Sequence, residues 1–367
     1  DRAAARKLQE DGNYQEAVVL FRKLLANPTV DPVQVPGDLQ RGLDCLMRLG
    51  QQADLDGFLE DAIAVHGGNW RLLRQAANVY AGSLPHHGQL IGGEFHRGYF
   101  GGGRRGRGAG RWVDCSGRDR VRALQLLQQA LPLVQALPRP SPDAADFHLD
   151  FARLAGADAD PGNAWRLQRL TDLSRLPDLD APADGGAAGG APVGADGQPV
   201  FYGVPASWEA AVSDGERWRW LLRQSEEADP ARAGRARLAF AQVLQAQFDV
   251  QTLVAYGSWF GGRDAADRGG IFAVDTLKDD ETIARLATGV RRFTLPEGQR
   301  FIGLLKDLAA GDAVTSVRRD ATRLLVSIYE NRRQYPEAVT WLERFTAFDD
   351  QNAAAGIRRI TGNWGQF

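Results

Sequence analysis

The chain has 367 residues, of which 44% are hydrophobic and 25% charged, and its formal net charge is −2 at pH 7. This near-neutral balance gives no global reason to expect a nucleic acid or an anionic lipid as partner, and no apolar run approaches the roughly 18 residues of a membrane-spanning helix. Two cysteines, Cys45 and Cys115, are too few for a disulfide-rich scaffold.

The N-terminus starts at Asp1 without a charged and apolar leader, so we expect a processed protein or a piece of a longer one. The first predicted helix covers residues 14–25, where apolar residues recur at steps of three and four. Asn13 is expected to cap this helix, and Glu16 to close a capping box. The apolar face comprises Tyr14, Ala17, Val18, Phe21, Leu24 and Leu25.

One short motif, Tyr-x-Glu-Ala-Val, occurs at residues 14–18 and again at 335–339. An aromatic residue followed three positions later by alanine is typical of the second helix of a tetratricopeptide-like hairpin. The small alanine lets the partner helix approach, and the aromatic ring fills the groove beside it. The Trp and Gly signals of the first helix in that repeat are weak or missing, so the match is partial.

Amphipathic stretches continue along the chain and predict roughly fourteen helices joined mostly by short turns. We therefore predict an all-α fold, an irregular α-solenoid of tetratricopeptide-like hairpins with long Gly-rich loop insertions. The stretches include residues 39–46, 55–62, 70–80, 147–154, 238–248, 283–290 and 301–308.

Helix starts are predicted where capping residues precede these stretches. Asp279 and Asp280 are expected at another helix start, where their charge suits the helix dipole. The predicted starts are Ser116 with Asp119, Ser213 with Glu216, and Asp229 before Pro230.

Three stretches interrupt the helical pattern. Residues 83–117 form a Gly-rich and Arg-rich insertion between two helices that would otherwise pair, and residues 177–206 read as a linker or long loop. The third interruption is residues 257–270. Short strands are expected at 199–202 and 271–274, where they can pair as a hairpin. The predicted organisation is a helical region at 1–176, the linker at 177–206, and a second helical region at 207–367.

Histidines and a cysteine in the insertion raise two chemical alternatives. His86, His87 and His96 are a candidate metal site, although their spacing lacks a paired ligand pattern. Cys115 is a candidate nucleophile with one of these histidines as base, although no third orienting group is evident. The simpler interpretation is solvated loop histidines, with Cys45 in the core. We therefore predict no catalytic, metal-binding or cofactor-binding residues.

Positive charge gathers between residues 94 and 122, where eight arginines face three acidic residues, a net charge of +5. Arginine with glycine and aromatic residues is typical of segments that stack on single-stranded nucleic acid. The favoured alternative is a soluble loop whose arginines pair with carboxylates of the chain or of an acidic protein partner. The candidate partner-binding residues are Arg104, Arg105, Arg107 and Arg111.

A second candidate patch lies at residues 213–220, which mix charges with the indoles of Trp218 and Trp220. These two residues are candidates for partner binding. The favoured alternative places Trp218 in the core, with the side chains of Arg217 and Arg219 lying over aromatic rings. The chain has no phosphate-binding loop, no His-Glu-x-x-His motif and no Gly-x-Ser-x-Gly motif.

Four segments, residues 119–133, 165–173, 213–220 and 280–289, resemble the N-terminal helical region of large bacterial alpha-2-macroglobulin-family proteins. That resemblance implies an exported protein of the periplasm or cell envelope whose β-sandwich domains inhibit endopeptidases. Neither cysteine begins the Cys-x-Glu-Gln thioester motif of the family, so no trap residue is carried over. The implied role is a noncatalytic scaffold that binds a protein or downstream domains of its own chain.

Overall fold

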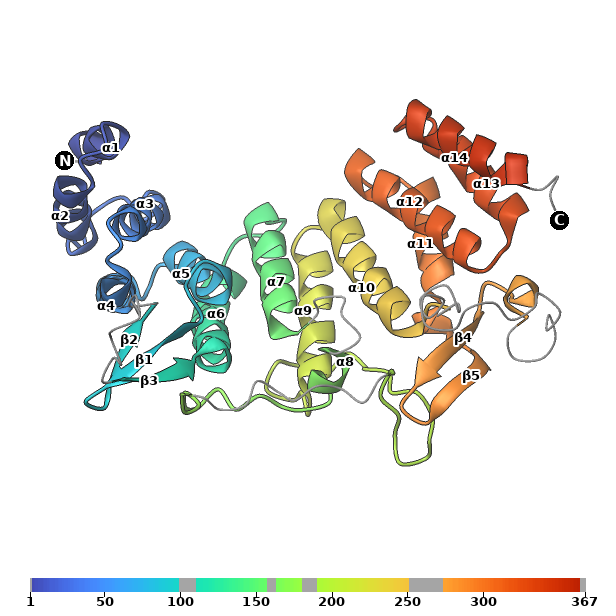
Figure 1. Cartoon of the computed structure of the whole chain (residues 1–367), viewed down its shortest axis with the longest axis horizontal. Helices are drawn as coiled ribbons and strands as arrows, with labels where there is room; N and C mark the ends of the chain where they lie inside the picture. Colours follow the sequence, from blue (N-terminus) through green and yellow to red (C-terminus); the bar gives the residue numbers. More distant parts are fainter. Residues whose placement is uncertain (1, 99–109, 157–162, 180–189, 251–272, 364–367) are drawn as a thin grey trace, which may run out of the picture. The chain divides into compact units, whose positions relative to one another are not determined.

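The computed structural model describes residues 2–98, 110–156, 163–179, 190–250 and 273–363 (Figure 1). These residues form fourteen α-helices and two small antiparallel sheets, so the predicted helical character is confirmed, although the fold is not purely all-α. The chain divides into two compact units, residues 1–138 with 171–185 and residues 139–170 with 186–367. In the described part of the chain, no helix is long and apolar enough to cross a membrane.

The first unit is built from helices joined by short connections. Helix α2 begins at Tyr14, as predicted, and buries Ala17 and Phe21 completely. The predicted cap is wrong, because the side chain of Asn13 makes no capping hydrogen bond. The helices are α1 (Arg2–Glu10), α2 (Tyr14–Leu25), α3 (Val35–Arg48), α4 (Leu55–His66), α5 (Trp70–Gly82) and α6 (Ser116–Gln135).

The turn before α2 has a defined backbone geometry. Gly12 has a φ of +82°, and the N–H of Asn13 donates to the carbonyl of Leu8 at 2.8 Å. A left-handed residue followed by a bond that reaches back five positions ends a helix and reverses the chain. Gly50, with a φ of +70°, ends α3 in the same way.

The predicted loop insertion instead contains a three-stranded antiparallel sheet with the order β2-β1-β3. Strands β1 (His87–Ile91) and β2 (Glu94–Arg97) are joined by Gly92 and Gly93, both of which have positive φ angles. A Gly-Gly pair between strands is a strong hairpin signal. Strand β3 (Gly110–Asp114) pairs with the other side of β1. Helices α5 and α6, which flank the insertion in sequence, pack against each other as expected.

The second unit begins with α7, although the predicted first helical region, residues 1–176, includes this helix. Ser141 caps α7 through a hydrogen bond from the N–H of Ala144, and the Ser225 hydroxyl of α9 donates to the carbonyl of Ala145. The helices are α7 (Pro142–Ala155), α8 (Asn163–Arg166), α9 (Asp214–Ala228), α10 (Ala233–Phe248), α11 (Phe301–Ala310), α12 (Thr315–Asn331), α13 (Tyr335–Phe345) and α14 (Asp350–Asn363).

Two of the predicted helix starts are confirmed in this unit. Ser213 caps α9 by accepting a hydrogen bond from the N–H of Glu216 at 3.2 Å. Asp229 accepts from the N–H of Ala231, one residue after Pro230, and begins the 3₁₀ turn that leads into α10. The third predicted start is confirmed only in position, because α6 begins at Ser116 without a side-chain cap.

Aromatic rings from α7, α9 and the segment between them form the core of this unit. Trp208 lies 4.7 Å from Phe151 and 6.3 Å from Trp220 between ring centroids. His148 of α7 contacts the edge of Trp220 and is 1% exposed. These contacts explain why α7 packs with α9, since its aromatic face finds rings of comparable size there.

The helix predicted over residues 283–290 is wrong, because residues 281–294 form a β-hairpin. Strands β4 (Glu281–Leu286) and β5 (Gly289–Thr294) pair in register, and Gly289 closes the turn with a φ of +122°. Within β4, the alternating residues Thr282, Ala284 and Leu286 are buried on one face, and Ile283 on the other face is buried as well. A short apolar run such as this one fits both the helical and the strand period. The antiparallel pairing of β4 with β5 decides in favour of the strand.

Neighbouring predictions are corrected in the same region. Asp279 does not start a helix but accepts hydrogen bonds from Lys306 and from the Tyr329 hydroxyl. The strands expected at 199–202 and 271–274 do not form a hairpin with each other in the described residues. Pro199 makes an isolated bridge with Val193, Val274 begins a 3₁₀ turn, and residues 271–272 lie outside the described part.

Arg333 occupies a left-handed position that glycine fills elsewhere, with a φ of +56°. We expect Arg333→Gly to stabilise the protein by about 1 kcal/mol, because glycine has no Cβ to strain this conformation. The reciprocal change Gly12→Ala should cost a similar amount. Thermal unfolding followed by circular dichroism measures both, and a destabilising Arg333→Gly would contradict the assigned turn.

Burial of His148 predicts that the folded protein loses stability as the pH falls. Burial lowers the pKa of His148 from 6.5 to about 4, so its contribution to stability is complete above pH 6.5 and is lost as the pH falls towards 4. The linked change reaches about 3 kcal/mol. His148→Phe should therefore show a smaller fall in Tm between pH 7.5 and pH 4 than the wild type. Equal pH profiles would show that His148 is not buried in its neutral form.

Candidate functional site

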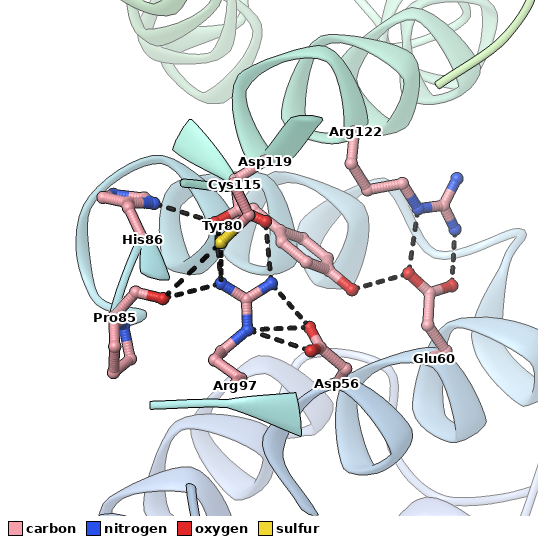
Figure 2. A network of polar contacts seen from close by, with 9 residues as sticks. All are labelled: Asp56, Glu60, Tyr80, Pro85, His86, Arg97, Cys115, Asp119 and Arg122. Carbon is pink, nitrogen blue, oxygen red and sulfur yellow. Dashed lines mark hydrogen bonds and ion pairs between the residues drawn. The ribbon is translucent and has the colours of Figure 1, made fainter. Parts of the chain in front are cut away.

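The most concentrated polar chemistry in the first unit surrounds Arg97, at the end of strand β2 (Figure 2). Arg97 pairs with Gly88 in the sheet register, and its side chain is 3% exposed. Its Nη1 and Nη2 atoms donate to the two carboxylate oxygens of Asp119 on α6, each at 2.7 Å. This is a two-pronged pairing of a guanidinium with a carboxylate, the strongest geometry available to arginine.

The remaining donors of Arg97 are also used. Nε and Nη2 donate to Asp56 on α4 at 2.9 Å, and Nη1 donates to the carbonyl of Pro85 at 2.8 Å. One side chain therefore connects the sheet to α4, to α6 and to the segment after α5. A buried cation with every donor bonded is paired internally and offers no free group to a ligand.

Asp119 has a second partner in His86, whose Nδ1 lies 2.8 Å from Oδ2 of the carboxylate. Burial opposes ionisation of Asp119, but the hydrogen bonds from Arg97 and His86 outweigh it, and the pKa of this carboxyl is lowered. Asp119 is therefore an ionised anchor for two side chains. It was predicted as a helix-start residue, and its role in the folded chain is to neutralise Arg97.

The Cys115 thiol borders this cluster but is not an activated nucleophile. Its Sγ lies 3.3 Å from Nη1 of Arg97 and 3.5 Å from Oδ2 of Asp119, and the residue is 1% exposed. Burial raises the pKa of this thiol to about 12 despite the nearby guanidinium. A thiol that stays protonated and buried is inert at neutral pH. His86, the candidate base, bonds to Asp119.

A second ionic group lies next to the first and ties the same helices. Arg122 of α6 donates to both carboxylate oxygens of Glu60 on α4, at 2.9 and 2.6 Å. The Tyr80 hydroxyl of α5 donates to Glu60 at 2.7 Å. Burial and the carboxylate of Glu60 raise the pKa of Tyr80, so the phenol stays neutral. These bonds hold α4, α5 and α6 together.

The three histidines of the candidate metal site are not brought together. His86 bonds to Asp119, His87 stacks on Trp112 at 4.7 Å between ring centroids, and His96 pairs with Gln89 in the sheet register. Within the described ranges, no three side chains of types that bind metals converge.

Several described arginines between residues 94 and 122 bond to their own unit. Arg97 and Arg122 pair with carboxylates, Arg118 donates to the carbonyl of Pro177, and Arg120 donates to the Thr171 hydroxyl. For Arg97 and Arg122, the predicted pairing with carboxylates of the chain is confirmed. Arg111 lies on strand β3. The other candidates, Arg104, Arg105 and Arg107, lie outside the described residues.

The aromatic candidates Trp218 and Trp220 are 2% and 6% exposed, so they belong to the core of the second unit and form no surface patch. Their flanking arginines lie over aromatic rings, as the alternative predicted. Cζ of Arg217 is 4.7 Å from the centroid of the Trp208 ring, and Cζ of Arg219 is 3.6 Å from that of Phe240.

Comparison with known proteins adds no relative. No protein-family model matches the chain, and no curated protein matches it. The resemblance to the alpha-2-macroglobulin family therefore stays a prediction from the sequence.

The cluster around Arg97 was not predicted, because along the sequence Arg97 is only one of eight arginines between residues 94 and 122. A usable signal was present in the Gly-Gly hairpin. Recognising residues 87–97 as two strands places Arg97 opposite Gly88. Gly88 itself leaves room for its neighbours on β2, because a Cβ at this position would lie 2.3 Å from the carbonyl oxygen of His96 and 2.5 Å from the Phe95 ring.

Removing Arg97 should leave the carboxylate of Asp119, which is 2% exposed, without its main compensation. We expect Arg97→Met to destabilise the first unit by about 3–5 kcal/mol. Arg175→Gln is the control, because the pair of Arg175 with Asp172 is exposed and should contribute little to stability. Urea unfolding monitored by circular dichroism measures both.

The double variant Arg97→Met with Asp119→Leu separates the two causes of this loss. It should recover much of the stability, because it removes the unpaired charge together with its partner. A double variant as unstable as Arg97→Met would show that the charge of Asp119 is not the cause.

Proposed function

We propose that this chain is a noncatalytic helical-repeat scaffold that binds protein, and that it forms the N-terminal part of an exported alpha-2-macroglobulin-like endopeptidase inhibitor. The observation that carries the proposal is a helix–turn–helix connection of one kind that recurs in both units. In the first unit it lies between α1 and α2, and in the second between α12 and α13.

The two connections correspond bond by bond. Gly12 and Arg333 both have positive φ angles two positions before a tyrosine. The next residue donates five positions back, from Asn13 to Leu8 and from Gln334 to Tyr329, at 2.8 and 2.9 Å. The Tyr-x-Glu-Ala-Val motif follows each turn. A connection that recurs with its own sequence motif supports a helical repeat, and repeats of this class present binding surfaces.

The polar clusters support a scaffold over an enzyme. Arg97 uses its donors on the protein itself, and burial keeps the Cys115 thiol protonated. General acid–base or nucleophilic catalysis needs a group within reach of a substrate. The cluster around Arg97 instead connects secondary-structure elements, which is a structural task.

The test is direct binding between this helical region and the β-sandwich domains that the proposal places downstream in the parent chain. We expect isothermal titration calorimetry to give a saturable complex with a Kd of about 10 μM or tighter. Failure of the parent reading frame to encode such domains, or no heat of binding at 100 μM protein, would contradict the proposal. A labelled single-stranded RNA serves as the control, and tight binding that weakens steeply with salt would favour the nucleic-acid alternative.

A further inference from the structure

Arg219 of helix α9 stands out among the arginines of the second unit. Its guanidinium carbon lies 3.6 Å from the centroid of the Phe240 ring on α10. The side chain is partly buried, and its Nε atom is buried without a hydrogen-bond partner. Neither of its two Nη atoms is both buried and without a partner. The ring thus holds the guanidinium in place while its outer nitrogens keep access to solvent.

The charge of Arg219 has no counter-ion in the described part of the chain. The neighbouring carboxylate that acts on it is Glu226, and Glu226 is paired with Arg237 at 3.5 Å. Burial lowers the pKa of Arg219 to about 10, which shows that the surroundings disfavour its charge. Removing a cation from water without pairing it is costly, so a site of this kind gains free energy when an anion arrives.

Nearby arginines on the same helix differ in this respect. Arg217, two residues earlier, also lies over an aromatic ring but pairs with Asp214 at 3.3 Å. Arg223, one turn later, pairs with Glu227 at 2.7 Å. Arg219 is therefore a preoriented guanidinium between two arginines whose charges are already compensated.

We propose that Arg219 receives a carboxylate from the protein partner, so that the surface formed by α9 and α10 recognises an acidic segment. This inference rests on the proposed scaffold function and specifies the chemistry of its partner. A planar guanidinium offers a pair of parallel N–H donors that match the two oxygens of a carboxylate. Stacking on Phe240 fixes the plane of the fork before binding, which reduces the entropy that binding must offset.

The test uses an acetylated, fluorescein-labelled hexaglutamate peptide and fluorescence anisotropy at low salt. We expect saturable binding to the wild type, and a loss of about tenfold or more in affinity for Arg219→Gln, since hydrogen bonds to charged groups are the stronger class. The control is Arg223→Gln, which removes one positive charge from the same helix and should change the affinity less than about threefold. Thermal unfolding of both variants confirms that they fold.

Three outcomes would overturn the inference. They are no saturable binding by the wild type, equal losses for Arg219→Gln and Arg223→Gln, or displacement of the peptide by inorganic phosphate but not by acetate. Binding to the macroglobulin-type domains distinguishes a failure of this inference from a failure of the proposed scaffold function. If those domains bind the wild type and Arg219→Gln equally, the carboxylate contact is wrong and the scaffold function stands. If they bind neither, the scaffold function itself is wrong.

Discussion

The pairing of Arg97 with Asp119 is the interaction on which the first unit depends most. It places a guanidinium and a carboxylate, each 2–3% exposed, 2.7 Å apart, and it joins a small sheet to helices that come before and after it in the chain. A three-stranded sheet of four- and five-residue strands has little apolar surface of its own. Its attachment therefore relies on this cluster, in which the hydrogen bonds from Arg97 and His86 lower the pKa of Asp119 and keep it ionised.

The second unit attaches its own small sheet by a different use of arginine. Arg332, at the end of α12, is fully buried, and its Nη1 and Nη2 donate to the carbonyls of Lys278 and Glu281. Gln334 donates to the carbonyls of Asp275 and Leu277. Long polar side chains from the turn between α12 and α13 thus hold the segment that leads into β4, where backbone acceptors take the place of carboxylates.

These two attachments bear on function because they occupy buried charged groups with partners inside the chain. Arg97, Asp119 and Arg332 all bond within their own units. Arg219 is the contrast, since it is held by an aromatic ring and lacks a counter-ion in the described residues. Under the proposed function, Arg97 and Arg332 serve the fold, and Arg219 is the arginine left to contact a partner.

The amino-acid sequence by itself determined the helices with a strong 3.6-residue period, the helix α2 that starts at Tyr14, the caps at Ser213 and Asp229, and the placement of Trp218 in the core, because these follow from contacts within a few residues. The tertiary structure alone decided the rest. Residues 283–290 suit either a helix or a strand until Thr282, Ala284 and Leu286 meet the core. The partners of Arg97 lie 41 and 22 positions away. No local pattern specifies such a pairing, since only the folded chain brings these charges together and removes them from water.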